Sequence, residues 1–164
     1  MKRKSQDMKI ADVMTMNPDW CIPQTPATQA ARIMKETNVG IIPVVDSESG
    51  RTLVGVVTDR DLCVAVVAMG VHPDSVQVGQ AMTSEVVTCQ PNDKLRKAAD
   101  VMRDNQIRRV PIVDEKGVLQ GMVSTADIIQ RSNMSPDLTH HILRKVTEPT
   151  EEASRPRAQM KRAA

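Results

Sequence analysis

Two short segments of this chain place a hydroxyl group three residues before a carboxylate. Thr58 precedes Asp61 in one segment and Ser124 precedes Asp127 in the other, and each pair follows an apolar run and opens a predicted helix. In one interpretation each pair is a capping box, which satisfies backbone N–H groups at the start of a helix. In the other, the hydroxyl donates to a phosphate near the helix N-terminus and the carboxylate accepts both hydroxyls of a ribose. The spacing leaves both interpretations open, and one pair can serve both.

The sequence predicts no catalytic residue and no metal site. His72, His140 and His141 lie away from the two segments, in a predicted linker and a predicted last helix. No nucleophile–base pattern, HExxH pattern or glycine-rich phosphate loop occurs. A Mg²⁺ site at Asp59 and Asp61, beside bound phosphates, remains an alternative. We therefore expect a protein that is not an enzyme and needs no cofactor.

The two segments belong to an internal duplication. Residues 14–46 align with residues 82–114 at a constant offset of 68, and ten of the 33 positions are identical. The match resumes at an offset of 66, where Gly55 aligns with Gly121 and Asp61 with Asp127. Two copies are too few for a solenoid. They favour a pseudo-symmetric pair with two equivalent clefts where the halves meet.

Each copy reads as strand, helix, strand, turn, strand and helix, which is an α+β pattern. Apolar residues at helical spacing predict the first helix of each copy. These residues are Ala27, Ala30, Ala31 and Met34 in the first copy, and Leu95, Ala98, Ala99 and Met102 in the second. Thr25 and Pro26 are typical of an N-cap followed by proline at the first helical position.

Short β-branched runs predict the strands and the boundaries between elements. The predicted extended segments are Val86–Cys89, Ile41–Val45, Arg109–Val113, Leu53–Val57 and Leu119–Val123. The second helices are expected to begin at Asp59 and Thr125. Glycine and proline mark residues 69–79 as a linker. A short helix is expected after Pro136 and a disordered tail beyond Glu148.

Size and composition limit the function classes. A unit of about sixty residues buries too little apolar surface to be stable alone, so each copy is expected to complete the other's core. Trp20 is the only aromatic residue, which argues against single-stranded nucleic-acid binding by base stacking. The absence of an apolar run of eighteen residues, and of an apolar leader, argues against a membrane protein or a signal peptide.

The cysteines and the basic termini each leave two interpretations. Three cysteines without metal-type spacing indicate a reducing cytoplasm, and Cys21 and Cys89 are expected to be small buried residues, with a redox switch as the alternative. Basic residues gather at both ends of the chain, and the central part carries a net charge of about −4. These ends are expected to be solvated and disordered, with contact to an acidic partner as the alternative.

Six marks in the right order give the chain a resemblance to tandem CBS domains, the pair called a Bateman module. The marks are Val13-Met14-Thr15, Ile42-Pro43-Val44-Val45-Asp46 and Gly55 to Asp61, and then Ala81-Met82-Thr83, Val110-Pro111-Ile112-Val113-Asp114 and Gly121 to Asp127. The resemblance covers about residues 8–133. It implies two β-α-β-β-α units, 8–69 and 78–133, related by a pseudo-twofold axis and followed by a helix and basic tail over 134–164. It also implies AMP, ADP, ATP or a related adenosyl ligand, and a homodimer.

The resemblance also implies roles for individual residues. Asp61 and Asp127 would hold the ribose, while Thr58 and Ser124 would meet the phosphates. Each site would combine this signature from one unit with the first strands of the other. The first site would then contain Thr58, Arg60, Asp61, Val87, Ile107, Arg108 and Arg109, and the second would contain Ser124, Asp127, Pro18, Val39 and Ile41.

The arginines in these two sets predict unequal sites. Arg60, Arg108 and Arg109 belong to the first set, whereas the equivalent positions hold Ala126, Gly40 and Ile41. Arginine makes charge-assisted, bidentate contacts to phosphate. The first site is therefore expected to bind a phosphorylated adenosine more tightly than the second. The alternative is that these arginines are surface cations or pair with an acid such as Asp104.

Taken together, the sequence predicts a stand-alone regulatory module that senses an adenine nucleotide and signals through its dimer geometry or an unidentified protein partner. One alternative is a structural or interaction module whose hydroxyl–acid pairs only cap helices. The other is a nucleic-acid-binding protein that uses the basic ends as contacts.

Overall fold

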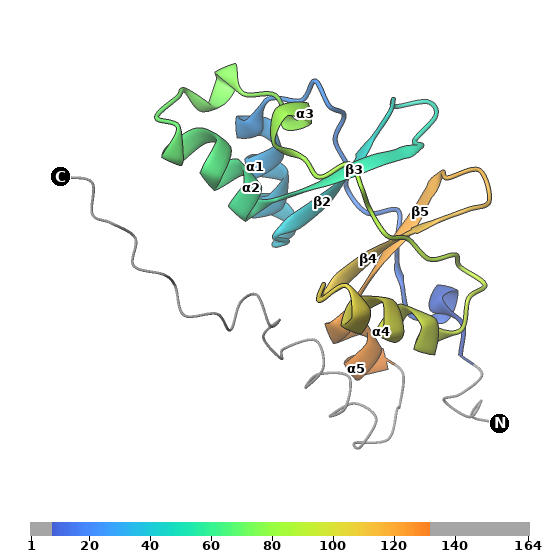
Figure 1. Ribbon diagram of the computed structural model, residues 1–164. Helices are drawn as coiled ribbons and strands as arrows, with labels where there is room; N and C mark the ends of the chain where they lie inside the picture. The colour runs from blue at the N-terminus through green and yellow to red at the C-terminus, as the bar shows by residue number, and fades with distance from the viewer. Residues whose placement is uncertain (1–7, 132–164) are drawn as a thin grey trace, which may run out of the picture.

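The computed structural model describes residues 8–131 and has two lobes, one for each copy of the repeat (Figure 1). The first lobe contains α1 (Ala27–Thr37), β2 (Ile41–Val45), β3 (Leu53–Thr58) and α2 (Asp59–Cys63), and α2 continues into the π-helical turn η3 (Val64–Ala68). The second lobe contains α4 (Leu95–Asp104), β4 (Arg109–Val113), β5 (Leu119–Ser124) and α5 (Thr125–Arg131). Shorter elements precede each lobe: η2 (Ile10–Asp12) and β1 (Thr15–Met16), then η4 (Pro73–Ser75) and α3 (Val78–Ala81). The predicted α+β fold class is confirmed.

The two copies exchange their leading segments. Strand β1 opens the first copy, yet it pairs antiparallel with β5 of the second, where Thr15 lies opposite Met122 and Met16 opposite Gly121. The equivalent of Thr15 in the second copy, Thr83, exchanges two backbone hydrogen bonds of 2.9 Å with Val56 in β3. Each hairpin is therefore extended at one edge by backbone that belongs, in sequence, to the other copy.

The hydrophobic cores follow the same exchange. Ile10 and Val13 pack in the core of the second lobe, together with residues of α4, β4, β5 and α5. Val76 and Val78 pack in the core of the first lobe, together with residues of α1, β2, β3 and α2. Units bounded at 8–69 and 78–133 therefore share core residues across their boundary. The expectation that each copy completes the other's core agrees with this packing.

Two glycines allow the exchanged backbones to approach. A Cβ atom on Gly55 would lie 2.8 Å from the carbonyl oxygen of Thr83, and a Cβ on Gly121 would lie 2.8 Å from that of Thr15. Such a contact with backbone cannot be relieved by turning a side chain. The glycine that opens each repeated signature therefore serves the contact between the copies.

The first helices differ from prediction at two points. Leu95, Ala98, Ala99 and Met102 are all buried, as predicted, but Ala31 of α1 is exposed. The N-cap of α1 is Pro26 rather than Thr25. Thr25 instead stabilises the preceding turn, because its Oγ1 accepts a hydrogen bond of 3.1 Å from the N–H of Ile22.

Strands β2, β3, β4 and β5 begin where predicted, whereas β1 was not predicted. Strands β3 and β5 each run one residue further than predicted, because Thr58 and Ser124 still pair with Ile41 and Arg109. The predicted extended segment Val86–Cys89 forms no strand, and only Cys89 makes a parallel bridge, to Ile112.

The predicted linker, residues 69–79, contains η4 and the start of α3. The helix and tail expected after Pro136 lie outside the described residues. Within 8–131, every helix is too short or too polar to cross a membrane.

Candidate functional site

Both hydroxyl–acid pairs form complete capping boxes. Thr58 Oγ1 accepts from the N–H of Asp61 at 3.1 Å, and Asp61 Oδ2 accepts from the Thr58 N–H at 2.9 Å and the Thr58 hydroxyl at 2.7 Å. Ser124 and Asp127 make the same three bonds, at 3.1, 2.9 and 2.6 Å. The capping interpretation is confirmed. It does not exclude ligand binding, because a carboxylate has two acceptor oxygens and one group can serve both roles.

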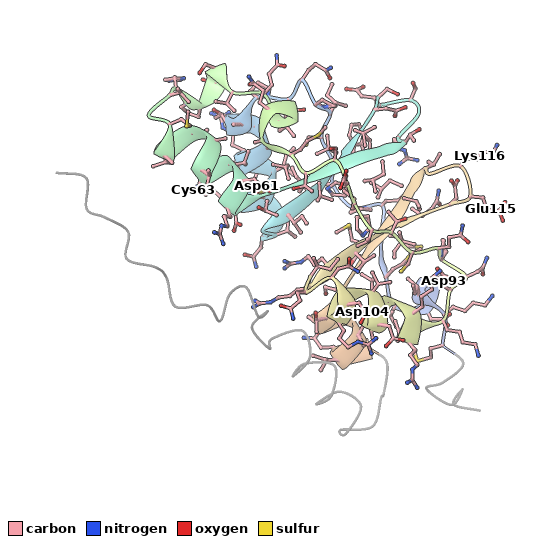
Figure 2. All side chains as sticks on the ribbon, viewed as in Figure 1. Asp61, Cys63, Asp93, Asp104, Glu115 and Lys116 are labelled. Atoms are coloured by element: carbon pink, nitrogen blue, oxygen red, sulfur yellow. The ribbon has the colours of Figure 1, made fainter. Side chains whose placement is uncertain are left out.

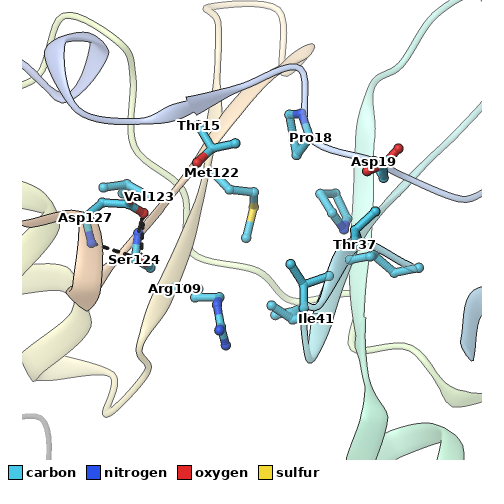
Figure 3. A pocket seen from close by; sticks show the side chains of 13 residues that line it. Thr15, Pro18, Asp19, Thr37, Ile41, Arg109, Met122, Val123, Ser124 and Asp127 are labelled. Carbon is cyan, nitrogen blue, oxygen red and sulfur yellow. Dashed lines mark hydrogen bonds between the residues drawn. The ribbon is translucent and has the colours of Figure 1, made fainter. Parts of the chain in front are cut away.

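A cavity of about 400 Å³ lies between the lobes beside the second capping box (Figure 3). Ser124 and Asp127 line it from the second copy, and Pro18, Val39 and Ile41 line it from the first. The structure thus brings together all five residues expected at the second site. They come from the end of β5, the start of α5, the start of β2 and the segment after β1.

Arg109 differs from the sequence prediction. It was assigned to the first site, but in the structure it lines the cavity of Ser124 and Asp127. The reason is the strand register, since Arg109 opens β4 directly opposite Ser124 at the end of β5. The cavity beside the second capping box therefore contains one arginine, where the sequence predicts none.

The other residues predicted for the first site do not join this cavity. Thr58 and Asp61 lie in the first lobe, at the start of α2, where Figure 2 labels Asp61. Ile107 packs against the core of the second lobe, and Val87 is 39% exposed. Arg60 and Arg108 are exposed, and the Arg108 carbonyl accepts bonds of 2.9 and 3.2 Å from the N–H and hydroxyl of Thr125.

Sequence reasoning missed several residues of the cavity wall. The additional lining residues are Thr15, Asp19, Thr37, Ile42, Pro43, Met122 and Val123. Asp19 could have been found, because the offset of 68 relates it to Val87, which was predicted for the first site. Thr15 and Met122 could not, because they meet only through the exchange of β1.

The charges in the cavity are two carboxylates and one guanidinium. Asp19 and Asp127 approach from opposite walls, and Arg109 lies between Ser124 and Ile41 in the view of Figure 3. Arg109 makes no ion pair with any residue in the part of the chain that the structure describes. Asp104, offered as an alternative partner, instead pairs with Arg103 at 2.7 Å. Among the described residues no group of three or more metal-binding side chains occurs.

The two predicted buried cysteines are confirmed. Cys21 and Cys89 are 3% and 2% exposed. Burial raises the pKa of the Cys21 thiol to about 12 and that of Cys89 to about 11, with the negative charge of Asp93 also raising the pKa of Cys89. Both thiols therefore stay protonated near neutral pH, when they behave as small apolar groups.

The sequence profile of the CBS domain matches residues 10–68 and 78–133, which is more than half of the chain. The chain belongs to the CBS domain family. The tandem pair inferred from the six sequence marks is confirmed. The prediction that this chain is not an enzyme agrees with its similarity to a CBS domain-containing protein over most of that protein's length.

Two bacterial relatives match this chain over most of their own length, and one of them is a CBS domain-containing protein. The uncharacterized protein YlbB of Bacillus subtilis is 39% identical over 120 residues, covering 73% of this chain and 79% of YlbB. The CBS domain-containing protein YhcV of the same organism is 38% identical, covering 77% of this chain and 88% of YhcV. Inosine-5'-monophosphate dehydrogenase of Aquifex aeolicus is 33% identical, but the match covers only 24% of that enzyme.

Two similar solved structures contain adenosyl compounds. CBSX2 in complex with AMP is 27% identical with a TM-score of 0.64, and the match covers 74% of this chain and 93% of that one. The CBS domain pair of protein MJ0100, in complex with 5'-methylthioadenosine and S-adenosyl-L-methionine, is 27% identical with a TM-score of 0.66, covering 75% and 94%.

Proposed function

We propose that this chain is a regulatory module that binds an adenine nucleotide, or a related adenosyl compound, in the cavity between its lobes. The observation that carries the proposal is the composition of that cavity. It joins a hydroxyl–acid pair from one copy to an apolar wall from the other, with one guanidinium between them.

Each part of such a ligand has a matching group. The Asp127 carboxylate can accept hydrogen bonds from two ribose hydroxyls while it keeps its capping bonds, since a carboxylate offers about four lone-pair positions. Arg109 and the Ser124 hydroxyl suit a phosphate. Val39, Ile41 and Met122 offer apolar contact to the adenine ring. A volume of about 400 Å³ lies in the range of small-molecule sites.

The two solved relatives support this ligand class. AMP in CBSX2 and the two compounds in the MJ0100 pair share adenine and ribose but differ in the group beyond the ribose. The choice among AMP, ADP, ATP and S-adenosylmethionine therefore depends on the groups that meet that end of the ligand. In this chain we assign that role to Arg109.

Ligand-dependent melting tests the proposal. A ligand at a hundred times its dissociation constant stabilises the native state by about 2.7 kcal/mol. We expect at least one of AMP, ADP, ATP or S-adenosylmethionine to raise the melting temperature of the wild-type chain, and Asp127→Ala to abolish the shift.

Asp93→Ala is the matched control. The Asp93 carboxylate also accepts from a backbone N–H three residues away, that of Gln90 at 2.8 Å, but Asp93 does not line the cavity. This variant should lose stability and keep the ligand shift. If no adenosyl compound changes the melting temperature, the module binds no such ligand and the capping boxes serve the fold alone.

We also propose that the module is a homodimer and that the face of α2 and η3 forms its interface. This face exposes Val64 at 55%, Val67 at 71% and Met69 at 70%, and it borders an apolar groove of about 480 Å³ between α1 and α2. Contiguous exposed apolar surface of this kind is typical of an interface. A similar protein of 25% identity, a CBS-CP12 protein, is described as hexameric. Ligand binding would then change the geometry of this interface, and a protein partner would respond to that change. The module would act in a reducing compartment such as the cytoplasm.

Sedimentation equilibrium tests the interface. Val67→Asp should shift the molecular mass from dimer to monomer, because a charge would be buried in the contact. Glu115→Ala, an exposed substitution in the turn between β4 and β5 (Figure 2), should leave the dimer intact. A monomeric wild type would exclude the interface without affecting the ligand proposal.

A further inference from the structure

We propose that the two clefts of this module share one guanidinium, that of Arg109, so that each chain binds one phosphate-bearing ligand tightly and a second one weakly. This inference rests on the proposed function and adds a rule for how the clefts influence each other.

The internal repeat places Arg109 at the centre of the module. The offset of 68 relates Ile41 to Arg109, and their cross-strand partners Thr58 and Ser124 are also equivalent. Both Ile41 and Arg109 line the cavity, from β2 and β4 respectively, and they face each other across it (Figure 3). An operation that exchanges the two copies therefore exchanges these two residues. The pair lies beside the pseudo-twofold axis and borders both clefts.

The same operation gives the lining of the equivalent cleft beside the first capping box, which is formed by Thr58 and Asp61. Ser124 and Asp127 map to Thr58 and Asp61, and the wall residues Asp19 and Val39 map to Val87 and Ile107. Ile41 and Arg109 map to each other. Arg109 is the one cation in either set of lining residues. Arg60 and Arg108 have no equivalent among the lining residues, so they do not replace it.

Nothing in the described structure holds Arg109 in one cleft. Its side chain is exposed and makes no ion pair with a described residue, whereas Arg103 on α4 is held by Asp100 and Asp104 at 2.7 Å. A long side chain beside the axis can turn toward either capping box. The carboxylates of the two clefts, Asp19 and Asp127 in one and Asp61 in the other, repel a phosphate that Arg109 does not neutralise.

Binding of a phosphate-bearing ligand in one cleft therefore lowers the affinity of the other cleft for a second such ligand. Once Arg109 contacts a phosphate in one cleft, a second phosphate meets only carboxylate, hydroxyl and apolar groups. The loss of one charge-assisted contact lowers affinity by about tenfold or more. A neutral ligand such as adenosine does not need Arg109, so the two clefts should bind it independently.

Calorimetric titration with AMP and with adenosine tests the proposal on three proteins: the wild type, Ile41→Arg and Arg109→Ile. For the wild type we expect two AMP sites whose dissociation constants differ by about tenfold or more, and no such difference for adenosine. Ile41→Arg supplies a second guanidinium at the equivalent position and should produce two tight AMP sites. Arg109→Ile makes the pair symmetric without charge and should weaken AMP at both sites while leaving adenosine unchanged.

The outcomes separate the two proposals. Equal AMP sites in the wild type, or an Arg109→Ile protein that binds AMP as the wild type does, would overturn the shared guanidinium while adenosine binding still supports the proposed function. Arg109→Ile decides the matter if Ile41→Arg does not fold. If neither AMP nor adenosine binds the folded wild type, the shared guanidinium is wrong, and the melting series with ADP, ATP and S-adenosylmethionine decides the proposed function.

Discussion

At the scale of single residues, burial separates the three thiols into two kinds. Cys21 and Cys89 are buried and their pKa values are raised to about 12 and about 11, whereas Cys63 is exposed on α2 (Figure 2). The thiolate is the reactive form, and a raised pKa leaves almost none of it at pH 8.

Iodoacetamide at pH 8 should therefore modify Cys63 alone in the folded Val67→Asp variant, in which the proposed dimer interface beside Cys63 is open. Intact-mass spectrometry should show a single adduct, and two more should appear only after addition of denaturant. Cys63→Ser should remain unmodified under native conditions. An adduct on Cys21 or Cys89 in the folded protein would contradict the burial that we describe.

Asp93 links a turn to the helix that follows it. Its Oδ2 accepts from the Gln90 N–H and from Lys97 Nζ, both at 2.8 Å. Partial burial raises the pKa of this carboxyl, but the bonds from Lys97 and Gln90 outweigh it and hold the pKa below its usual value. The repeat relates Asp93 to Thr25, which accepts from Ile22 in the same way.

A lowered pKa in the folded state contributes stability that is present above the pKa of the unfolded chain, about 4. This contribution is lost as the pH falls through the lower, folded value. Denaturant unfolding from pH 7 to pH 2 should therefore show wild type more stable than Asp93→Asn above about pH 5, with the gap closing at lower pH. A gap that widens on acidification would show that the carboxylate is not held as described.

At the scale of elements, the contact between β1 and β5 depends on a missing side chain. Gly121→Ala would place a Cβ 2.8 Å from the Thr15 carbonyl oxygen and force β1 away from β5. We expect a loss of about 1–3 kcal/mol in unfolding free energy, as is usual for an overpacked contact. Urea denaturation measures it.

Gly40→Ala is the comparison, because its Cβ would lie 3.0 Å from Asp59 Oδ2, the end of a side chain that can turn. Its cost should be clearly smaller than that of Gly121→Ala. Equal costs for the two variants would show that the strand contact is not the cause.

At the scale of the whole molecule, exchange of leading segments should make the two lobes unfold together. Ile10 lies in the sequence before the first copy, but it is 0% exposed in the core of the second lobe. Ile10→Ala should cost about 2–5 kcal/mol. Amide hydrogen exchange should then accelerate in both lobes, at β2 and β3 as well as at β4 and β5.

Glu115→Ala, at an exposed position in the turn between β4 and β5, serves as the control and should change exchange rates little. If Ile10→Ala accelerated exchange in the second lobe alone, the lobes would be independent folding units, and the exchange of segments would not couple them.

Local chemistry let the sequence predict much of this molecule. The apolar stripe of α4, the strands β2 and β4, and the start of each second helix follow from side-chain spacing and from hydrogen bonds between residues three or four apart. The pairing of Thr58 with Asp61 and of Ser124 with Asp127 is of the same kind. A segment determines such features with little help from distant parts of the chain.

Tertiary structure decided which distant segments meet. That β1 belongs to the second hairpin, and that Arg109 lines the cavity of Ser124, depends on strand pairing between residues far apart in the sequence. Local propensity leaves such pairings open, because several arrangements of the same elements satisfy it equally. The packing of both cores selects one of them. The repeat therefore predicted two clefts, but only the folded chain shows that Ile41 and Arg109, which the repeat makes equivalent, line the same cavity.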